Sequence, residues 1–181
     1  ISQWSGQDSE REDCGPTAVA MVLDWAGLRP SSLIDPLFIA DVRLRVSPAR
    51  RYGAYPTDYN DLTQALNSYG LTAIDLIQPS ADLSAMRVAT GAGDAVIAFV
   101  NGPALGRRPL YGDHWVVVTG FTSDGRVLFL DPDDREGPGA NGALPVGFFG
   151  AAVLVANGPS LRVHARGTAV SNARRGAIAG Y

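Results

Sequence analysis

Apolar residues near the N-terminus recur at the spacing of an amphipathic helix. The stripe consists of Val19, Val22, Leu23 and Ala26. Pro16 falls in the first turn, where its missing N–H costs nothing, and Gly27 follows as a helix-ending residue. The pattern therefore predicts a helix that starts at Cys14 or one residue later and ends before Gly27.

Two further helices are predicted in the first half of the chain. One covers 31–46, with Pro36 in its first turn, because a proline further along would break the helix. The other starts at Thr57 or Asp58, either of which can cap a helix, and runs to Tyr69. The N-terminal half is therefore expected to be mainly helical.

The second half of the chain changes to the alternation of β-strands. The best hairpin joins 114–121 to 126–131 through a turn at Asp124 and Gly125. The remaining predictions are strands at 71–77, 95–100 and 148–157, a short helix at 81–90 and a loop at 131–145. Helices followed by an antiparallel sheet are typical of an α+β fold.

The chain is predicted to form one domain. Residues 1–157 contain every predicted element, whereas 158–181 is rich in Arg, Ala, Gly and Ser without periodicity, which indicates a linker or tail. Such a linker leaves room for a further domain after residue 181. No glycine-rich loop follows a strand, which excludes a doubly wound nucleotide-binding fold.

Composition narrows the range of partners. The formal net charge is −3, the hydrophobic fraction is 46% and the mean hydropathy is +0.03. A weakly acidic chain has no basic field that would attract nucleic acid. No apolar run reaches the roughly 18 residues of a membrane span. We therefore expect neither nucleic acid binding nor a membrane span.

The only cysteine, Cys14, allows two interpretations. A lone cysteine is commonly a small buried hydrophobe. At a helix N-terminus, however, the unpaired N–H groups and the helix dipole favour the thiolate, and a nearby imidazolium would favour it further. The stretch "REDCGPTAVAMVLDWAG" places Cys14 at such a position, so packing and nucleophilic catalysis both remain open at this point.

One of the two histidines is well placed to act with a cysteine. His114 opens the best strand, whereas His164 lies in the unpatterned C-terminal segment. An imidazole base needs an orienting acceptor, and Asp131 closes the strand paired with that of His114. Folding about a centre near residue 123 sets position 114 roughly opposite 132. The alternatives are a strand-edge histidine and a turn aspartate before Pro132.

An oxyanion hole would complete a nucleophilic site, because it donates hydrogen bonds to the charge that develops on the attacked carbonyl. The backbone N–H of Cys14 supplies one donor. The side-chain amide of Gln7 is the best second donor, with Gln3 behind it. Gln7 can also be interpreted as a solvated linker residue.

Together, a glutamine and the segments "DCGPTAVAMVL", "GDHWVVVTGF" and "VLFLDPD" resemble the papain-like cysteine peptidases of the bacteriocin-processing (double-glycine leader) type. The resemblance extends from about residue 3 to about residue 156. It implies a papain-like fold with N-terminal helices packed on an antiparallel β-sheet. It also implies cysteine peptidase activity without metal or cofactor.

The resemblance assigns roles to single residues. Gln7 resembles the oxyanion-hole glutamine, Cys14 the nucleophile, His114 the general base and Asp131 the residue that orients it. Gln7 stands one position further from Cys14 than is usual in such sites, where this chain has Asp8. We therefore expect a Cys-His-Asp triad that hydrolyses peptide bonds through a thioester.

The expected substrate is a peptide, most simply the peptide part of peptidoglycan. A domain followed by a linker-like tail, in a chain rich in Ala, Gly and Arg, suits a module of a bacterial or phage lysin that is secreted or released to the cell wall. The alternatives are a leader-processing peptidase and a catalytically inactive papain-like module used for binding. The transporter span and ATPase motif that usually accompany leader peptidases do not occur in the sequence.

Two metal-like patterns do not fit their metals. The acidic stretch "DPDDREG" lacks the alternating ligands and terminal Glu of a calcium loop, so we expect a solvated loop there. One cysteine and two histidines are too few for a zinc site of three or four such ligands.

Overall fold

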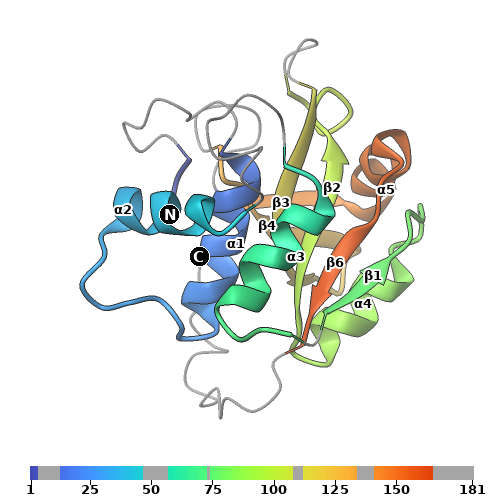
Figure 1. The fold of residues 1–181 in the computed structure, drawn as a ribbon. Coiled ribbons are helices and arrows are strands. Elements are labelled where there is room, and N and C mark those ends of the chain that lie inside the picture. The colour runs from blue at the N-terminus through green and yellow to red at the C-terminus, as the bar shows by residue number, and fades with distance from the viewer. Residues whose placement is uncertain (4–12, 47–56, 73, 108–111, 134–140, 165–181) are drawn as a thin grey trace.

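The computed structural model places α-helices on both faces of one β-sheet (Figure 1). It describes residues 1–3, 13–46, 57–72, 74–107, 112–133 and 141–164. The sheet has six strands in the order β1-β6-β2-β3-β4-β5, and every pair is antiparallel. The strands are β1 Ile74–Ile77, β2 Ala95–Asn101, β3 Asp113–Phe121, β4 Arg126–Leu130, β5 Asn141–Pro145 and β6 Ser160–Val163.

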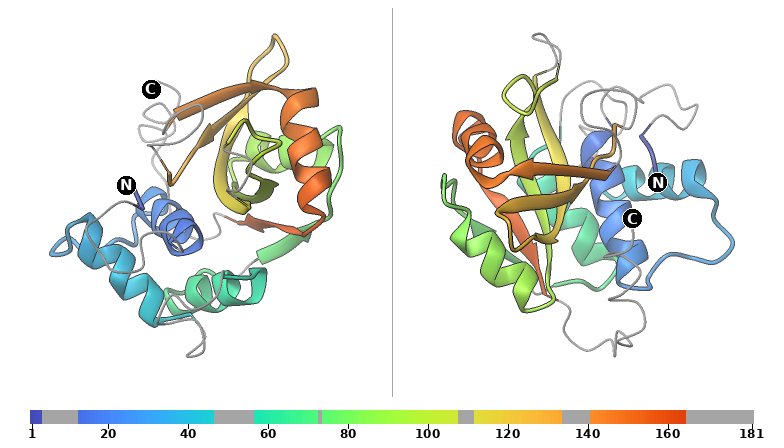
Figure 2. Two further views of the ribbon diagram at one scale, coloured as in Figure 1. Left: turned by 90° about the horizontal axis from the view of Figure 1, so that it is seen from above. Right: turned by 180° about the vertical axis from the view of Figure 1, so that it is seen from behind.

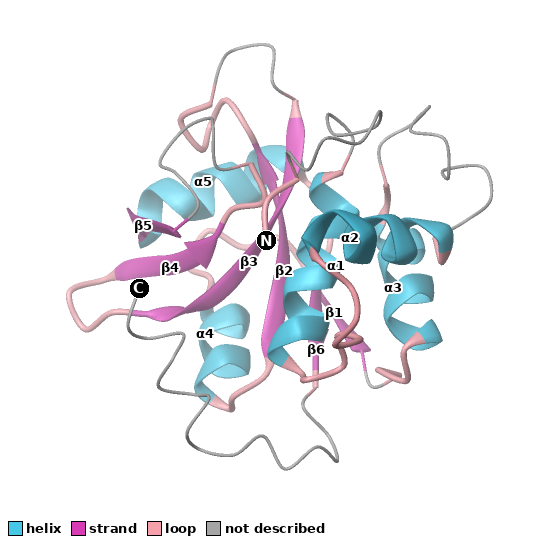
Figure 3. Ribbon diagram, turned by 90° about the vertical axis from the view of Figure 1, so that its left-hand side faces the viewer, coloured by secondary structure: helices cyan, strands magenta, loops and turns pink. Residues whose placement is uncertain are grey.

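Three N-terminal helices cover one face of the sheet and two later helices cover the other (Figure 2). The first layer holds α1 Cys14–Trp25, α2 Asp35–Leu44 and α3 Tyr59–Ser68, and the second holds α4 Ser84–Gly91 and α5 Val146–Ala156. Helix α1 lies against β3 and is flanked by α2 and α3 (Figure 3). None of the helices in the described ranges is long and apolar enough to cross a membrane.

Alternate residues of the central strands build two separate apolar cores. On β3, Trp115 and Val117 pack in the core beneath α1, whereas Val116 and Val118 pack in the core beneath α4 and α5. Successive side chains of a strand point to opposite faces, so a strand buried on both faces reads as the continuous apolar run seen here.

The helix ends follow from local chemistry. Helix α1 begins at Cys14, as the sequence predicts, and Gly27 beyond its end has φ +74°. The cap of α3 is Asp58: its side chain accepts hydrogen bonds from the N–H groups of Asn60 (2.8 Å) and Asp61 (3.0 Å). The Asp61 carboxylate accepts from the Asp58 N–H in return, which completes a capping box.

The predicted last strand at 148–157 is wrong. The apolar run "FFGAAVLVA" belongs to helix α5, which packs its Phe149, Ala152 and Val153 against the sheet. A short apolar run has no polar residues to reveal its period, so strand and helix look alike in sequence. A helix satisfies its own backbone hydrogen bonds, and it can therefore lie on the face of a sheet without a partner strand.

The C-terminal segment also differs from expectation. The residues 160–163 were expected to lie in a linker or tail, yet β6 lies inside the sheet and pairs with both β1 and β2. The domain therefore extends beyond residue 157, at least through β6. The expected loop at 131–145 likewise ends in a strand, β5, which pairs with β4. Residues 165–181 lie outside the described part of the chain.

We expect Leu161→Ala in β6 to lower the free energy of unfolding by about 3 kcal/mol, because it leaves a cavity in a close-packed core. The side chain of Leu161 is fully buried. Leu154→Ala on α5 is the matched control, since Leu154 is 46% exposed and its truncation should cost at most about 0.5 kcal/mol. Urea denaturation measures both values. Equal effects would contradict the central position of β6.

Candidate active site

Cys14 is the first residue of α1 and its side chain is partly buried. It packs against the apolar core beneath α1, which includes Trp115 of β3. The first turn of a helix presents N–H groups without helical acceptors, and they stabilise negative charge at this position. The fold therefore places the only thiol of the chain at the N-terminal end of a helix.

A buried ion pair holds the start of α1. Asp13, the residue before Cys14, is 1% exposed and pairs with the Arg43 guanidinium from α2. Burial lowers the pKa of Arg43 from its ordinary value. Since a buried carboxylate is costly without a cation, this pair ties the orientation of α1 to α2.

We expect Arg43→Met to lower the free energy of unfolding by about 2 kcal/mol, because it leaves the Asp13 carboxylate buried without its cation. Arg45→Met is the matched control. Arg45 pairs with Asp41 near the surface, so its loss should cost less than about 1 kcal/mol. Urea denaturation of both variants at pH 7 gives the comparison. A smaller effect of Arg43→Met than of Arg45→Met would contradict the buried pair.

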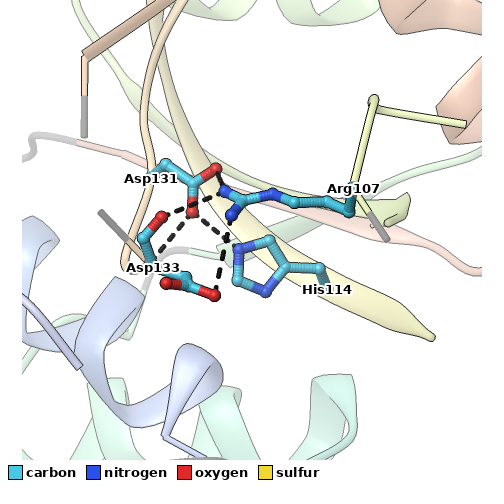
Figure 4. Close-up of polar contacts among 4 residues, drawn as sticks. All are labelled: Arg107, His114, Asp131 and Asp133. Carbon is cyan, nitrogen blue, oxygen red and sulfur yellow. Dashed lines mark hydrogen bonds and ion pairs between the residues drawn. The ribbon is translucent and has the colours of Figure 1, made fainter. Parts of the chain in front are cut away.

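His114 and Asp131 are joined by a hydrogen bond inside the protein. His114 is the second residue of β3, Asp131 directly follows β4, and the distance from Nε2 to Oδ1 is 2.8 Å (Figure 4). The exposed fractions are 1% and 0%. The observed register pairs Val117 with Leu130, which brings the two side chains to the same end of the hairpin, as expected from the turn.

Two residues that the sequence reasoning missed complete the surroundings of Asp131. The Asp133 N–H donates to Asp131 Oδ1 at 2.9 Å, and the Arg107 guanidinium donates to Oδ2 (Figure 4). Arg107 also donates to the Asp133 carbonyl at 3.1 Å and lies 3.6 Å from the Asp133 carboxylate. Asp131 and Asp133 are both fully buried, so the expectation of a solvated acidic loop is wrong for these residues.

The environment keeps the His114 imidazole neutral. Burial lowers the pKa of His114 to about 3, the Arg107 charge acts in the same direction, and the Asp133 charge opposes it. A neutral imidazole has one N–H, and the bond to the Asp131 carboxylate holds that hydrogen on Nε2. Nδ1, on the other side of the ring, is then a proton acceptor. The resting site therefore holds a neutral base rather than an imidazolium.

The residues next to Cys14 and His114 contact the same residue, Thr57. A Cβ at Gly15 would overlap the Thr57 hydroxyl, so the backbone after Cys14 lies directly against Thr57. The Trp115 indole N–H, next to His114, donates to the Thr57 carbonyl at 3.0 Å. The start of α1 and the start of β3 thus both contact Thr57.

The structure describes only one of the two candidate oxyanion-hole glutamines. Gln7 lies outside the described residues, so its expected role stays a prediction. Gln3 is 1% exposed, and its N–H donates to the carbonyl of Pro132 at 2.9 Å. Gln3 therefore lies next to Pro132, the residue after Asp131.

The second histidine, His164, contacts two other aspartates, Asp75 and Asp94. The His164 ring nitrogens lie 2.5 Å from Asp75 and 3.3 Å from Asp94, just after β6. Within the described ranges, no group of three or more His, Cys, Asp and Glu side chains is arranged to hold a metal ion.

Comparison with known proteins gives a family match over most of the chain. Residues 1–152 match the Peptidase_C39 like family. A solved structure from Bacillus anthracis, described as that of a C39-like peptidase, is similar with a TM-score of 0.65 and 15% sequence identity. The alignment covers 91% of this chain and 92% of that chain. No curated protein matches the sequence.

Proposed function

The chain belongs to the Peptidase C39-like family of cysteine peptidases, and from this premise we propose that it hydrolyses peptide bonds with Cys14 as nucleophile. The α+β, papain-like fold expected from the sequence agrees with the similarity to the Bacillus anthracis structure. His114 is the proposed base and Asp131 the residue that orients it. The observation that carries the proposal is the buried His114–Asp131 hydrogen bond.

In the proposed reaction, His114 Nδ1 takes the proton of the Cys14 thiol while the sulfur attacks the carbonyl carbon of the scissile amide. The C–N bond then breaks, and His114 returns the proton to the departing amine. The thioester that remains is attacked by water, which gives a proton to His114. When the C–S bond breaks, the acid is released and the thiol recovers its proton.

The charge that develops on the carbonyl oxygen needs fixed donors. The backbone N–H of Cys14, at the open end of α1, is the first donor in this proposal. The Gln7 side chain is the second, as the resemblance implies, with Gln3 as the alternative. Gln7→Ala and Gln3→Ala should separate the two: loss of the oxyanion donor lowers kcat by about 10²-fold or more, whereas the other substitution should not.

The first test needs no substrate. The chain has one cysteine, so iodoacetamide labels Cys14 alone, and the labelling rate can be followed against pH. Because the thiolate is the reactive form, we expect wild-type protein to label with a midpoint below the free-thiol value of about 8.5. The neutral His114 ring takes the thiol proton as the sulfur attacks; in His114→Gln this base is lost, and labelling at pH 7 should slow by about tenfold or more.

His164→Gln is the matched control for this experiment, since it makes the same change at the histidine that contacts Asp75 and Asp94. Its labelling curve should coincide with that of the wild type. A curve that is the same for wild type and for His114→Gln would overturn the catalytic pairing. Cys14 would then be a packing residue.

For the substrate we propose peptide bonds of peptidoglycan, next to small residues such as Gly and Ala. This proposal depends on the composition, and the family match applies equally to a peptidase that cleaves a leader peptide. Incubation with purified cell walls should release soluble peptides with new amino termini, and Cys14→Ala should release none. If the protein cleaves a double-glycine leader peptide and leaves the cell walls intact, the substrate is a leader peptide. A biological effect that survives Cys14→Ala would select a binding module.

A further inference from the structure

Arg107 is a buried cation whose guanidinium contacts Asp131 and Asp133 of the candidate site. Its side chain is completely shielded from solvent. It contacts the carboxylates of Asp131 and Asp133 and the carbonyl oxygen of Asp133 (Figure 4). A guanidinium is planar and presents several N–H groups in a fixed fork, which suits it to hold more than one acceptor at once.

The backbone that carries Arg107 is itself held in place. The Arg107 N–H donates to the Gly102 carbonyl at 2.9 Å, and the Gly102 N–H donates to the Gly112 carbonyl at 2.8 Å. Leu105, two residues before Arg107, is 1% exposed in the core beneath α4 and α5. The guanidinium therefore projects from a turn that is anchored at the ends of β2 and β3.

The two oxygens of Asp131 have different partners, and this division restricts the carboxylate. Oδ2 accepts from Arg107, whereas Oδ1 accepts from the Asp133 N–H and from His114 Nε2. Rotation of the carboxylate would break bonds on both sides at once. The direction in which Asp131 presents its acceptor to His114 thus depends on Arg107.

We propose that Arg107 is a positioning residue of this site: it fixes the Asp131 carboxylate and, through it, the orientation and tautomer of His114. The inference rests on the proposed function for its consequence in catalysis, but its structural part concerns the imidazole alone. Arg107 also acts by its charge, since it contributes to the lowered pKa of His114.

The test is Arg107→Lys in the full chain, with two readouts. Lysine keeps the charge but lacks the planar fork, so the carboxylate loses its fixed direction. The tautomer of His114 is read from two-bond ¹H–¹⁵N correlations of protein labelled at its two histidines, assigned with His164→Gln. We expect the Nε2–H form in the wild type and a mixture of tautomers in Arg107→Lys.

The kinetic readout separates positioning from binding. A base displaced by a fraction of an ångström lowers kcat, and misplacement of about 1 Å can cost about 10²-fold. We therefore expect Arg107→Lys to lower kcat by about 10- to 100-fold and to change KM by less than about threefold. Arg126→Lys makes the same change in an exposed pair with Asp124 and should alter neither kcat nor the His114 tautomer.

One outcome would contradict the proposal for Arg107, and another would contradict only the proposed function. An unchanged tautomer and an unchanged kcat in Arg107→Lys would make Arg107 a purely structural residue. If this variant does not fold, the double variant Arg107→Lys with Asp133→Asn leaves one cation facing one carboxylate, and the same readouts apply. If Cys14→Ala keeps full activity, the proposed function fails, whereas the tautomer experiment still decides the role of Arg107.

Discussion

Asp131→Asn is expected to lower kcat/KM for amide hydrolysis by about 10⁴-fold. If the new amide turns its NH₂ toward His114, the imidazole must accept at Nε2 and carry its hydrogen on Nδ1, where it cannot act as a base. If it turns the NH₂ the other way, that group faces the Arg107 guanidinium. Both orientations disrupt the arrangement that gives Asp131 one acceptor for His114 and one for Arg107.

The matched control is Asp113→Asn, one residue before His114. Asp113 is exposed and accepts a hydrogen bond from the Asn101 amide at 3.0 Å. Its substitution makes the same chemical change next to the base, and activity should stay within about twofold. Steady-state kinetics on a peptide that the wild type cleaves gives both values. Comparable losses in the two variants would mean that Asp131 has no special relation to His114.

The stability of the protein should fall steeply in acid because of His114. The pKa of His114 is lowered to about 3 in the folded state, against an ordinary value of 6.5. Below pH 6.5 the unfolded chain binds a proton that the folded protein does not. Each further pH unit therefore lowers the free energy of unfolding by up to about 1.4 kcal/mol. Above pH 6.5 the buried, neutral His114 makes its full contribution to the free energy of unfolding. Roughly 5 kcal/mol of this free energy is lost as the pH falls to 3.

His114→Gln isolates this contribution, because glutamine cannot ionise while its amide can still donate to Asp131. Urea denaturation between pH 7 and pH 4 should show a slope for the wild type that is steeper by about 1 kcal/mol per pH unit. Both proteins keep Asp131 and Asp133, so the difference between the two series reports the replacement of the His114 ring. Parallel curves would show that His114 is protonated in the folded state near its ordinary pKa.

Part of the site can be predicted from sequence because its members stand at element ends. The position of Cys14 follows from the helix that begins there, and the pairing of His114 with Asp131 follows from one hairpin turn. Arg107 has no such signal. It stands in a loop beside a second arginine, and its partners are two dozen residues further along the chain.

The protonation state of His114 also could not be predicted from the sequence. A histidine at a strand start suggested an imidazolium that would support a thiolate at Cys14. The tertiary structure buries His114 and places Arg107 close to it, and both effects favour the neutral ring. A pKa depends on the dielectric and the charges around a group, which segments distant in sequence supply.

The helices and strands also differ in whether local or non-local interactions cause them to form. The sequence by itself determined the elements that carry their own start and stop signals: α1 with Gly27, α3 with its capping box at Asp58, and the β3–β4 hairpin. Each depends on hydrogen bonds and dihedral angles within a few residues.

Only the tertiary structure decided that 146–156 is a helix, that 160–163 is a strand inside the sheet, and that Arg107 joins Asp131. A short apolar segment gains its stability from the surface that it covers or the strands that it pairs with. β6 exists because β1 and β2, distant in sequence, offer it hydrogen bonds on both sides. The burial of a guanidinium likewise depends on carboxylates that the chain brings to it only when it folds.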